Sequence, residues 1–228
     1  MMNKNDINKY YDSLDISTND DRIRALAFLS AIIADSNQER LLLAFQALQE
    51  RQLNPKAIYE AILQSYLFLG FPRMIEAAIA FNEVYGSSTD LFESDFGQIN
   101  PEESTRWFKK GITLCKQVYG NNYERLKERF ISISPEMFRW MVIEGYGKVL
   151  TRPGLSSVER ELAEVAALIV DKRERQLISH IIGSLNVGAS ITLIKQVNDD
   201  IRQLAGKTAY KLANYSISKV ESNNDSAS

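Results

Sequence analysis

Apolar residues recur every three or four positions along most of the chain, which is the period of an amphipathic α-helix. The pattern is clear in RIRALAFLSAIIADS (22–36), which follows the acidic residues Asp20 and Asp21. It continues in NQERLLLAFQALQERQ (37–52), where Asn37 is a suitable N-cap. Strand-like alternation occurs only in RFISISP (129–135), which is too short to build a sheet. The chain is therefore predicted to be all-α.

Proline, glycine and capping residues divide this pattern into separate helices. Asn54 and Pro55 are typical of a helix start, and Gly70 and Gly86 of helix ends. Ser156 and Glu159 have the spacing of a capping box. Further helices are predicted within 72–85, 102–120, 121–130, 134–150, 156–170, 171–188, 190–206 and 207–220.

The second half of the chain repeats the pattern of the first. When the two halves are aligned so that Arg24 falls on Arg160, Gly70 falls on Gly206. Two copies of a helical unit are predicted to bury their apolar faces against each other, because one amphipathic hairpin has too little core alone. The predicted organisation is an N-terminal arm (1–20), a first repeat (21–86), a linker (87–101), a second repeat (102–217) and a disordered tail (218–228).

Composition and charge exclude several classes of function. The 228 residues include one cysteine and one histidine, so an intrachain disulfide, a CxxC pair and a His–His metal site are excluded. The net charge of −2 lacks the basic excess of a nucleic-acid-binding surface. The sequence has neither an apolar run long enough to span a membrane nor a signal-peptide core. We therefore expect a cytoplasmic protein that contacts neither nucleic acid nor membrane.

The single histidine, His180, is the first candidate for chemistry. It shares a helix face with Gln176, while Glu161 lies on the preceding helix and can turn towards it. One interpretation is an acid–base pair with Gln176 as a substrate contact. The other is a core-edge histidine hydrogen-bonded to a neighbour, with a helix-start carboxylate that offsets the helix dipole.

Two arginines beside chain turns are candidate anion contacts. Arg152 lies in TRPG and either clamps a carboxylate or caps the preceding helix. Arg73 follows the glycine–proline break of YLFLGFPR, either as an anion contact at a helix start or within an ordinary turn.

The second half of the chain resembles the carboxymuconolactone decarboxylase family. That family has a Gly-x-Val segment beside an Arg-Pro-Gly-Leu turn, a Glu/Arg-rich helix start, a Leu-x-x-His helix and a glycine loop. The matching positions here are Tyr146–Val149, Arg152–Leu155, Glu159–Leu162 and Gln176–His180; Gly111–Tyr123 is similar to the family's opening, and Ala57–Val84 to its closing half.

This resemblance implies an all-helical, alkylhydroperoxidase D-like bundle that assembles into trimers or hexamers. It also implies either decarboxylation of a lactone or thiol-dependent peroxide reduction, the latter with a Glu, a CxxC pair and a His. Glu161 and His180 match the family's Glu and His, but Arg173 and Gln176 stand at the cysteine positions. Because a thiolate must attack the peroxide, this departure argues against the peroxidase mechanism.

We therefore expect an enzyme that acts on a small carboxylated or lactone metabolite by His/Glu proton transfer. The expected site combines His180 and Glu161 with Tyr66 and Arg73, between repeats or subunits, and needs no metal or organic cofactor. The alternative is a non-catalytic oligomeric scaffold derived from such enzymes. A third reading, a peroxide reductase that relies on Cys115, lacks a second thiol.

Overall fold

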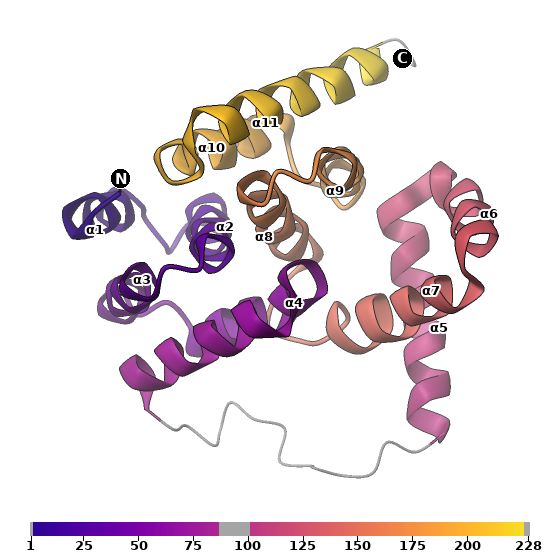
Figure 1. Ribbon diagram of the computed structural model, residues 1–228, viewed down its shortest axis with the longest axis horizontal. Helices are drawn as coiled ribbons and strands as arrows, with labels where there is room; N and C mark the ends of the chain where they lie inside the picture. The colour runs from indigo at the N-terminus through magenta and orange to yellow at the C-terminus, as the bar shows by residue number, and fades with distance from the viewer. Residues whose placement is uncertain (1, 87–100, 226–228) are drawn as a thin grey trace.

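The protein is helical throughout the part of the chain that can be described. A computed structural model describes residues 2–86 and 101–225, and every regular element in these ranges is a helix (Figure 1). The all-α prediction is therefore confirmed. The first half contains α1 (Lys4–Asp12), α2 (Asn19–Asp35), α3 (Gln38–Glu50) and α4 (Pro55–Tyr85). The second contains α5 (Pro101–Tyr119), η2 (Gly120–Asn122), α6 (Tyr123–Ile133), α7 (Pro135–Trp140), η3 (Met141–Val149), α8 (Ser157–Val170), α9 (Glu174–Asn186), α10 (Ile191–Asp200) and α11 (Arg202–Asp225).

Helices α2 and α8 pack against each other at the centre of the main bundle, which consists of α1 to α4 and α8 to α11. Both are buried on nearly all sides, because neighbouring helices enclose them, and the buried residues of α8 include four charged ones. Helices α3 and α4 cover α2, whereas α9 and α11 cover α8 (Figure 1). Helices α5, α6, α7 and η3 form a lobe at one side, with a smaller apolar core of its own (Figure 1).

The backbone geometry of the main bundle repeats in step with the sequence. Helices α3 and α9 begin and end at positions that correspond in the aligned halves, and α4 and α10 begin at corresponding positions. Gly70 has φ 79° and ψ 164°, and Gly206 has φ 79° and ψ 168°. Only glycine adopts this region readily, so each kink depends on its glycine. The predicted helix break at Gly70 is therefore a kink within α4, and Pro72 lies just beyond it.

The two chain ends are more ordered than the sequence indicated. Residues 1–20, predicted as an arm, contain α1, whose Tyr11 is fully buried against the main core. Helix α11 continues through Asp225 and buries Val220, so residues 218–225 of the tail predicted to be disordered are helical, and residues 226–228 lie outside the described residues. The predicted linker lies outside the described residues, apart from Pro101 at the start of α5.

Two glycines allow α5 and η3 to cross with their backbones in contact. A Cβ atom on Gly111 would lie 2.0 Å from the carbonyl oxygen of Val142, and one on Gly147 would lie 2.1 Å from that of Trp107. These distances are far shorter than any real Cβ contact, so a side chain at either position must separate the helices. Within the described residues, no helix combines the length and apolar character that a membrane crossing requires.

Gly147→Ala is expected to lower the free energy of unfolding by about 1–3 kcal/mol, because the clash is with rigid backbone. Gly145→Ala is the matched control, since a Cβ atom at Gly145 meets nothing within 4 Å. Urea denaturation of both variants measures the difference. Equal stabilities for the two variants would contradict the close crossing.

Candidate active site

His180 on α9 lies beside two carboxylates from α8. Glu161 and Glu164 are three residues apart, so they share one face of that helix. His180 Nδ1 lies 3.0 Å from Glu161 Oε2 and 2.9 Å from Glu164 Oε2. The hydrogen on Nδ1 can point fully at one acceptor, and Nδ1 donates it to Glu161. Glu164 is left with an electrostatic contact to the ring but without a hydrogen-bond donor. All three side chains are buried.

A small residue permits this approach of α8 to α9. A Cβ atom on Gly183, about one turn after His180, would lie 2.8 Å from Glu161 Oε2. The capping box predicted at Ser156 and Glu159 is present and fixes the start of α8. The capping box and Gly183 thus help to position the three charged groups, once α8 and α9 pack together.

The burial of this cluster changes the acidity of its members. Burial by itself lowers the pKa of His180, but Glu161 and Glu164 outweigh it and raise that pKa to about 10. Burial, together with repulsion from Glu161, raises the pKa of Glu164 to about 7. At neutral pH His180 is therefore an imidazolium that holds a proton, and Glu164 is poised to gain or lose one.

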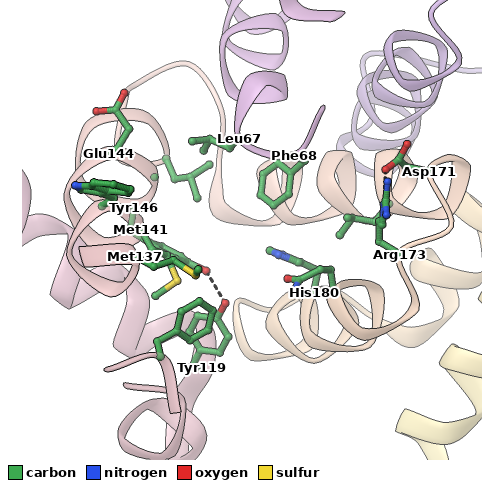
Figure 2. Close-up of a pocket in the computed structure, with 16 residues that line it drawn as sticks. Leu67, Phe68, Tyr119, Met137, Met141, Glu144, Tyr146, Asp171, Arg173 and His180 are labelled. Atoms are coloured by element: carbon green, nitrogen blue, oxygen red, sulfur yellow. Dashed lines mark hydrogen bonds and ion pairs between the residues drawn. The ribbon is translucent and has the colours of Figure 1, made fainter. Parts of the chain in front are cut away.

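His180 forms part of the wall of a pocket of about 590 Å³ between the main bundle and the side lobe. In Figure 2 the imidazole projects into this space from α9, facing Phe68 of α4. The two rings meet edge to face with centroids 5.2 Å apart. The remaining lining is mostly apolar and comes from Leu67, Phe130, Met137, Trp140, Met141, Gly145, Leu150 and Leu168, with Tyr119, Tyr146, Glu144, Asp171, Arg173 and Gln176 as the polar members.

Two tyrosine hydroxyls lie on the opposite side of this pocket. Tyr146 and Tyr119 share a hydrogen bond of 3.1 Å, and Figure 2 shows both oxygens directed towards His180. Tyr146 is carried by η3, a π-helix, a form that is rare and frequent at functional sites. Burial raises the pKa of both hydroxyls, so both remain protonated at neutral pH.

A second charged cluster surrounds Glu60 of α4 and adjoins the first, because Arg160 lies one turn before Glu164 on α8. Glu60 is fully buried and bonds Arg152 at 3.1 Å and Arg160 at 3.2 Å. Lys56 lies 3.3 Å from the same carboxylate. Arg160 also bonds Gln64 at 3.0 Å. This cluster joins α4 to α8.

Some of the predicted site residues come together and others do not. Glu161 contacts His180, and Gln176 lines the same pocket. Arg152 is instead paired with Glu60 and lies apart from the His180 pocket. Arg73 bonds Asp171, a residue of the pocket wall, at 3.0 Å. Tyr66 bonds Glu144, another wall residue, at 2.5 Å. Arg73 and Tyr66 therefore hold residues of the pocket wall in place without lining the pocket themselves.

Sequence reasoning missed Glu164, Tyr119 and Tyr146 as members of the site. Glu164 had a usable signal, because it lies three residues after Glu161 and so shares its helix face. Tyr146 lies in the family-like segment Tyr146–Val149, but nothing in the sequence places either tyrosine near His180, since they approach it only through the packing of α5 and η3 on the main bundle.

The same three charged residues are also of the types that bind metal ions. One ligand atom each from Glu161, Glu164 and His180 lies within 4.8 Å of the others. Because Nδ1 points at the carboxylates, a cation there would have to replace the Nδ1 proton. Cys115 is buried near Glu161, and burial with this neighbouring charge raises its pKa to about 12. A thiol with so high a pKa is a poor nucleophile, because almost none of it is ionised at neutral pH.

Part of the chain is similar to a known protein. No known protein-family profile matches the chain. A protein of Schizosaccharomyces pombe named Peroxisomal protein 2 is 28% identical over 132 residues. This match covers 58% of the chain and 60% of the relative, so it spans about three fifths of each. The chain is therefore similar to part of that yeast protein.

Proposed function

We propose that this protein is a carboxymuconolactone decarboxylase-like enzyme that acts on a small lactone or carboxylated metabolite by proton transfer. The observation that carries the proposal is His180, held by two buried carboxylates in the wall of a 590 Å³ pocket. A charged cluster of this kind costs stability when it is buried, and such groups gather at sites of proton transfer.

The repeat supports the family part of the proposal. The corresponding helices and the matching kinks at Gly70 and Gly206 fit two copies of one alkylhydroperoxidase D-like unit. At the positions that correspond to Glu161, Glu164 and His180, the first unit has Ala25, Phe28 and Ala44. One copy therefore keeps the acid–base groups, while the other is apolar there.

The geometry suggests how the proton moves. The carboxylates engage Nδ1, so Nε2 is the nitrogen left to face a ligand. Loss of carbon dioxide breaks a C–C bond and leaves its electron pair on the substrate carbon, conjugated with the carbonyl group. The Nε2 proton is transferred to that carbon, and the neutral imidazole is reprotonated from water. Glu161 orients the ring and stabilises its charged form.

Replacement of His180 tests this mechanism. A panel of lactones and β-keto acids is incubated with the wild type, and the fastest substrate is then assayed with His180→Gln. We expect turnover to fall about a hundredfold, the lower end of what a positioned acid or base contributes. Ser179→Ala, at the half-buried residue next to His180 that does not line the 590 Å³ pocket, is the matched control and should leave turnover unchanged.

A non-catalytic oligomeric scaffold is the second candidate, and an apolar stripe on α4 favours it. Phe71, Ile75 and Ile79 are 59%, 48% and 46% exposed. The corresponding positions of α11 hold Lys207, Lys211 and Tyr215, so the fold itself does not require an apolar face there. Such a face fits the trimer or hexamer expected from the resemblance. Failure of the wild type to convert any member of the panel would favour the scaffold.

The location of the protein belongs to the same proposal. The sequence predicts a cytoplasmic protein, whereas the name of the yeast relative favours the peroxisome. We give more weight to the peroxisome as the compartment to test.

A further inference from the structure

Another pocket, of about 140 Å³, lies between α6 and α9. This α6–α9 pocket is walled by the end of α5, by η2 and by the facing sides of α6 and α9. Tyr119 also belongs to the His180 pocket, where Figure 2 shows it, but the other residues that line the two pockets differ. The acid–base chemistry at His180 therefore leaves the α6–α9 pocket without a role.

Two arginines of α6 supply the charge of this pocket. Arg125 and Arg129 lie four residues apart, so they share the helix face that lines it. Like charges at this spacing repel each other and destabilise the helix. Within residues 2–86 and 101–225, no carboxylate forms an ion pair with either guanidinium group, whereas Arg152 and Arg160 share Glu60. An anion bound between Arg125 and Arg129 would relieve their repulsion.

The carboxylates of α6 do not line the pocket. Glu124 and Glu128 are exposed and lie outside it, and Glu124 is paired with Lys127 at 3.5 Å. The lining thus contains two cations and no carboxylate. On α9, the exposed Arg175 lies one turn before the lining residue Ser179, which adds positive charge beside the same helix face.

Two buried carboxylates act on the pocket from behind Tyr119. Burial is the main cause of the raised pKa of Tyr119, and the charges of Glu161 and Glu164 raise it further. His180 lies within ion-pair distance of both carboxylates and offsets at least one of their two charges. At most one uncompensated negative charge behind the wall therefore opposes two guanidinium groups in the lining, and the balance stays positive.

The polar residues of the pocket indicate which kind of anion fits. Asn122 stands at the N-cap position of α6, but its side chain makes no capping hydrogen bond, so its amide can donate to a ligand. Ser179 instead donates its hydrogen to the Arg175 carbonyl oxygen. A phosphate group has several oxygens and close to two negative charges, so it can accept from both arginines and the amide. A carboxylate has two oxygens and one charge, which leaves one arginine without a partner.

We propose that Arg125 and Arg129 bind a phosphate group in the α6–α9 pocket, with Asn122 as a further donor. The ligand is inorganic phosphate or a small phosphate ester, whose carbon atoms would contact the apolar side chains of Leu126 and Ile182. This binding site is separate from the acid–base groups and does not depend on the proposed function.

Isothermal titration calorimetry of the full chain at pH 8 and constant ionic strength tests the site. The probes are inorganic phosphate, glycerol 3-phosphate and acetate. We expect both phosphates to bind about tenfold more tightly than acetate, because acetate satisfies only one of the two arginines. Tighter binding of glycerol 3-phosphate than of inorganic phosphate would identify an ester as the ligand, and the reverse order would identify the free anion. Either order supports the site.

Arg125→Gln and Arg129→Gln each remove one guanidinium group from the pocket. Each should weaken phosphate binding about tenfold, as expected for the loss of a hydrogen bond between charged groups. Lys127→Gln is the matched control, because it removes the same charge from α6 outside the pocket, and it should change the affinity by about twofold or less. Both arginines are exposed, so the variants should fold, which urea denaturation without phosphate checks.

Three results would overturn the inference. They are phosphate binding no tighter than acetate binding, unchanged phosphate affinity in both arginine variants, and an equal loss of affinity in the arginine variants and Lys127→Gln. Binding is measured without turnover, so failure of this site leaves the proposed function standing, and an inactive protein that binds phosphate in this way would refute the proposed function alone.

Discussion

Glu60→Gln is expected to lower the free energy of unfolding by about 3–5 kcal/mol, the range found when one member of a buried ion pair is removed. Glu60 is fully buried, and Arg160 is 3% exposed. The substitution keeps the size of the side chain but deprives the Arg160 and Arg152 guanidinium groups of the carboxylate that both contact. Burial already lowers the pKa of Arg160, which indicates how much this cation depends on its partner. Urea denaturation at pH 7 measures the loss.

Asp200→Asn is the matched control, because the repeat supplies a comparable pair. Asp200 corresponds to Gln64 when the two halves are aligned, and it bonds Arg24 at 2.7 Å as Gln64 bonds Arg160. Arg24 is 21% exposed and also bonds Asp21, so it keeps an anionic partner in the variant. We expect a loss of about 1 kcal/mol. Equal losses for Glu60→Gln and Asp200→Asn would show that burial is not what makes the Glu60 cluster important.

The stability of the wild type is expected to fall as the pH rises above 6.5. The folded protein raises the pKa of His180 from 6.5 to about 10, so the native state binds a proton that the unfolded state releases. The stabilisation is complete below pH 6.5 and is lost as the pH approaches 10. A pKa difference of this size corresponds to about 5 kcal/mol, of which about 3 kcal/mol is lost by pH 9.

Glu164 changes stability in the same direction at lower pH. Its pKa is raised from 4.5 to about 7, so ionisation of this buried carboxyl destabilises the native state progressively over that interval. Urea denaturation at intervals from pH 5 to pH 9 measures both effects. His180→Gln lacks the imidazole, so its stability should fall less steeply than that of the wild type between pH 8 and pH 9, while Glu164, which no longer has the imidazolium to lower its pKa, titrates at a higher pH. A wild-type protein whose stability stays constant from pH 6.5 to pH 9 would contradict the imidazolium assignment.

The local features of the fold were predictable because they depend on neighbouring residues. The capping box at Ser156 and the helix start at Asn54 and Pro55 lie where the sequence places them. The glycine kinks could be located but not interpreted, since a glycine is equally typical of a helix end, whether a proline follows two residues later, as after Gly70, or none is near, as at Gly206. The helix predicted for 134–150 contains a change to π geometry at Met141, for which the apolar pattern gives no sign.

Pairs of charges were harder to predict than helices. Arg152 was expected to contact an anionic ligand, but the protein supplies the anion itself from Glu60, which lies 92 residues away. Likewise, Arg73 donates a hydrogen bond to Asp171, and the Tyr66 hydroxyl donates one to Glu144. A side chain that can bind an anion has the same sequence pattern whether its partner is a substrate or a distant carboxylate. Only the packing of α4 against α8 and η3 separates these cases.

By itself, the sequence determined the helical class, the helix starts, the internal repeat and the likeness of Glu161 and His180 to an acid–base pair. The first three follow from residues within one helix or from a direct comparison of the two halves, and the fourth follows from the resemblance to the family's Glu and His. Tertiary structure alone decided that Glu164 joins the pair, that the arginines are already partnered and that two tyrosine hydroxyls face His180. The physical reason is that burial and the distances between charges arise only when helices distant in the chain pack together.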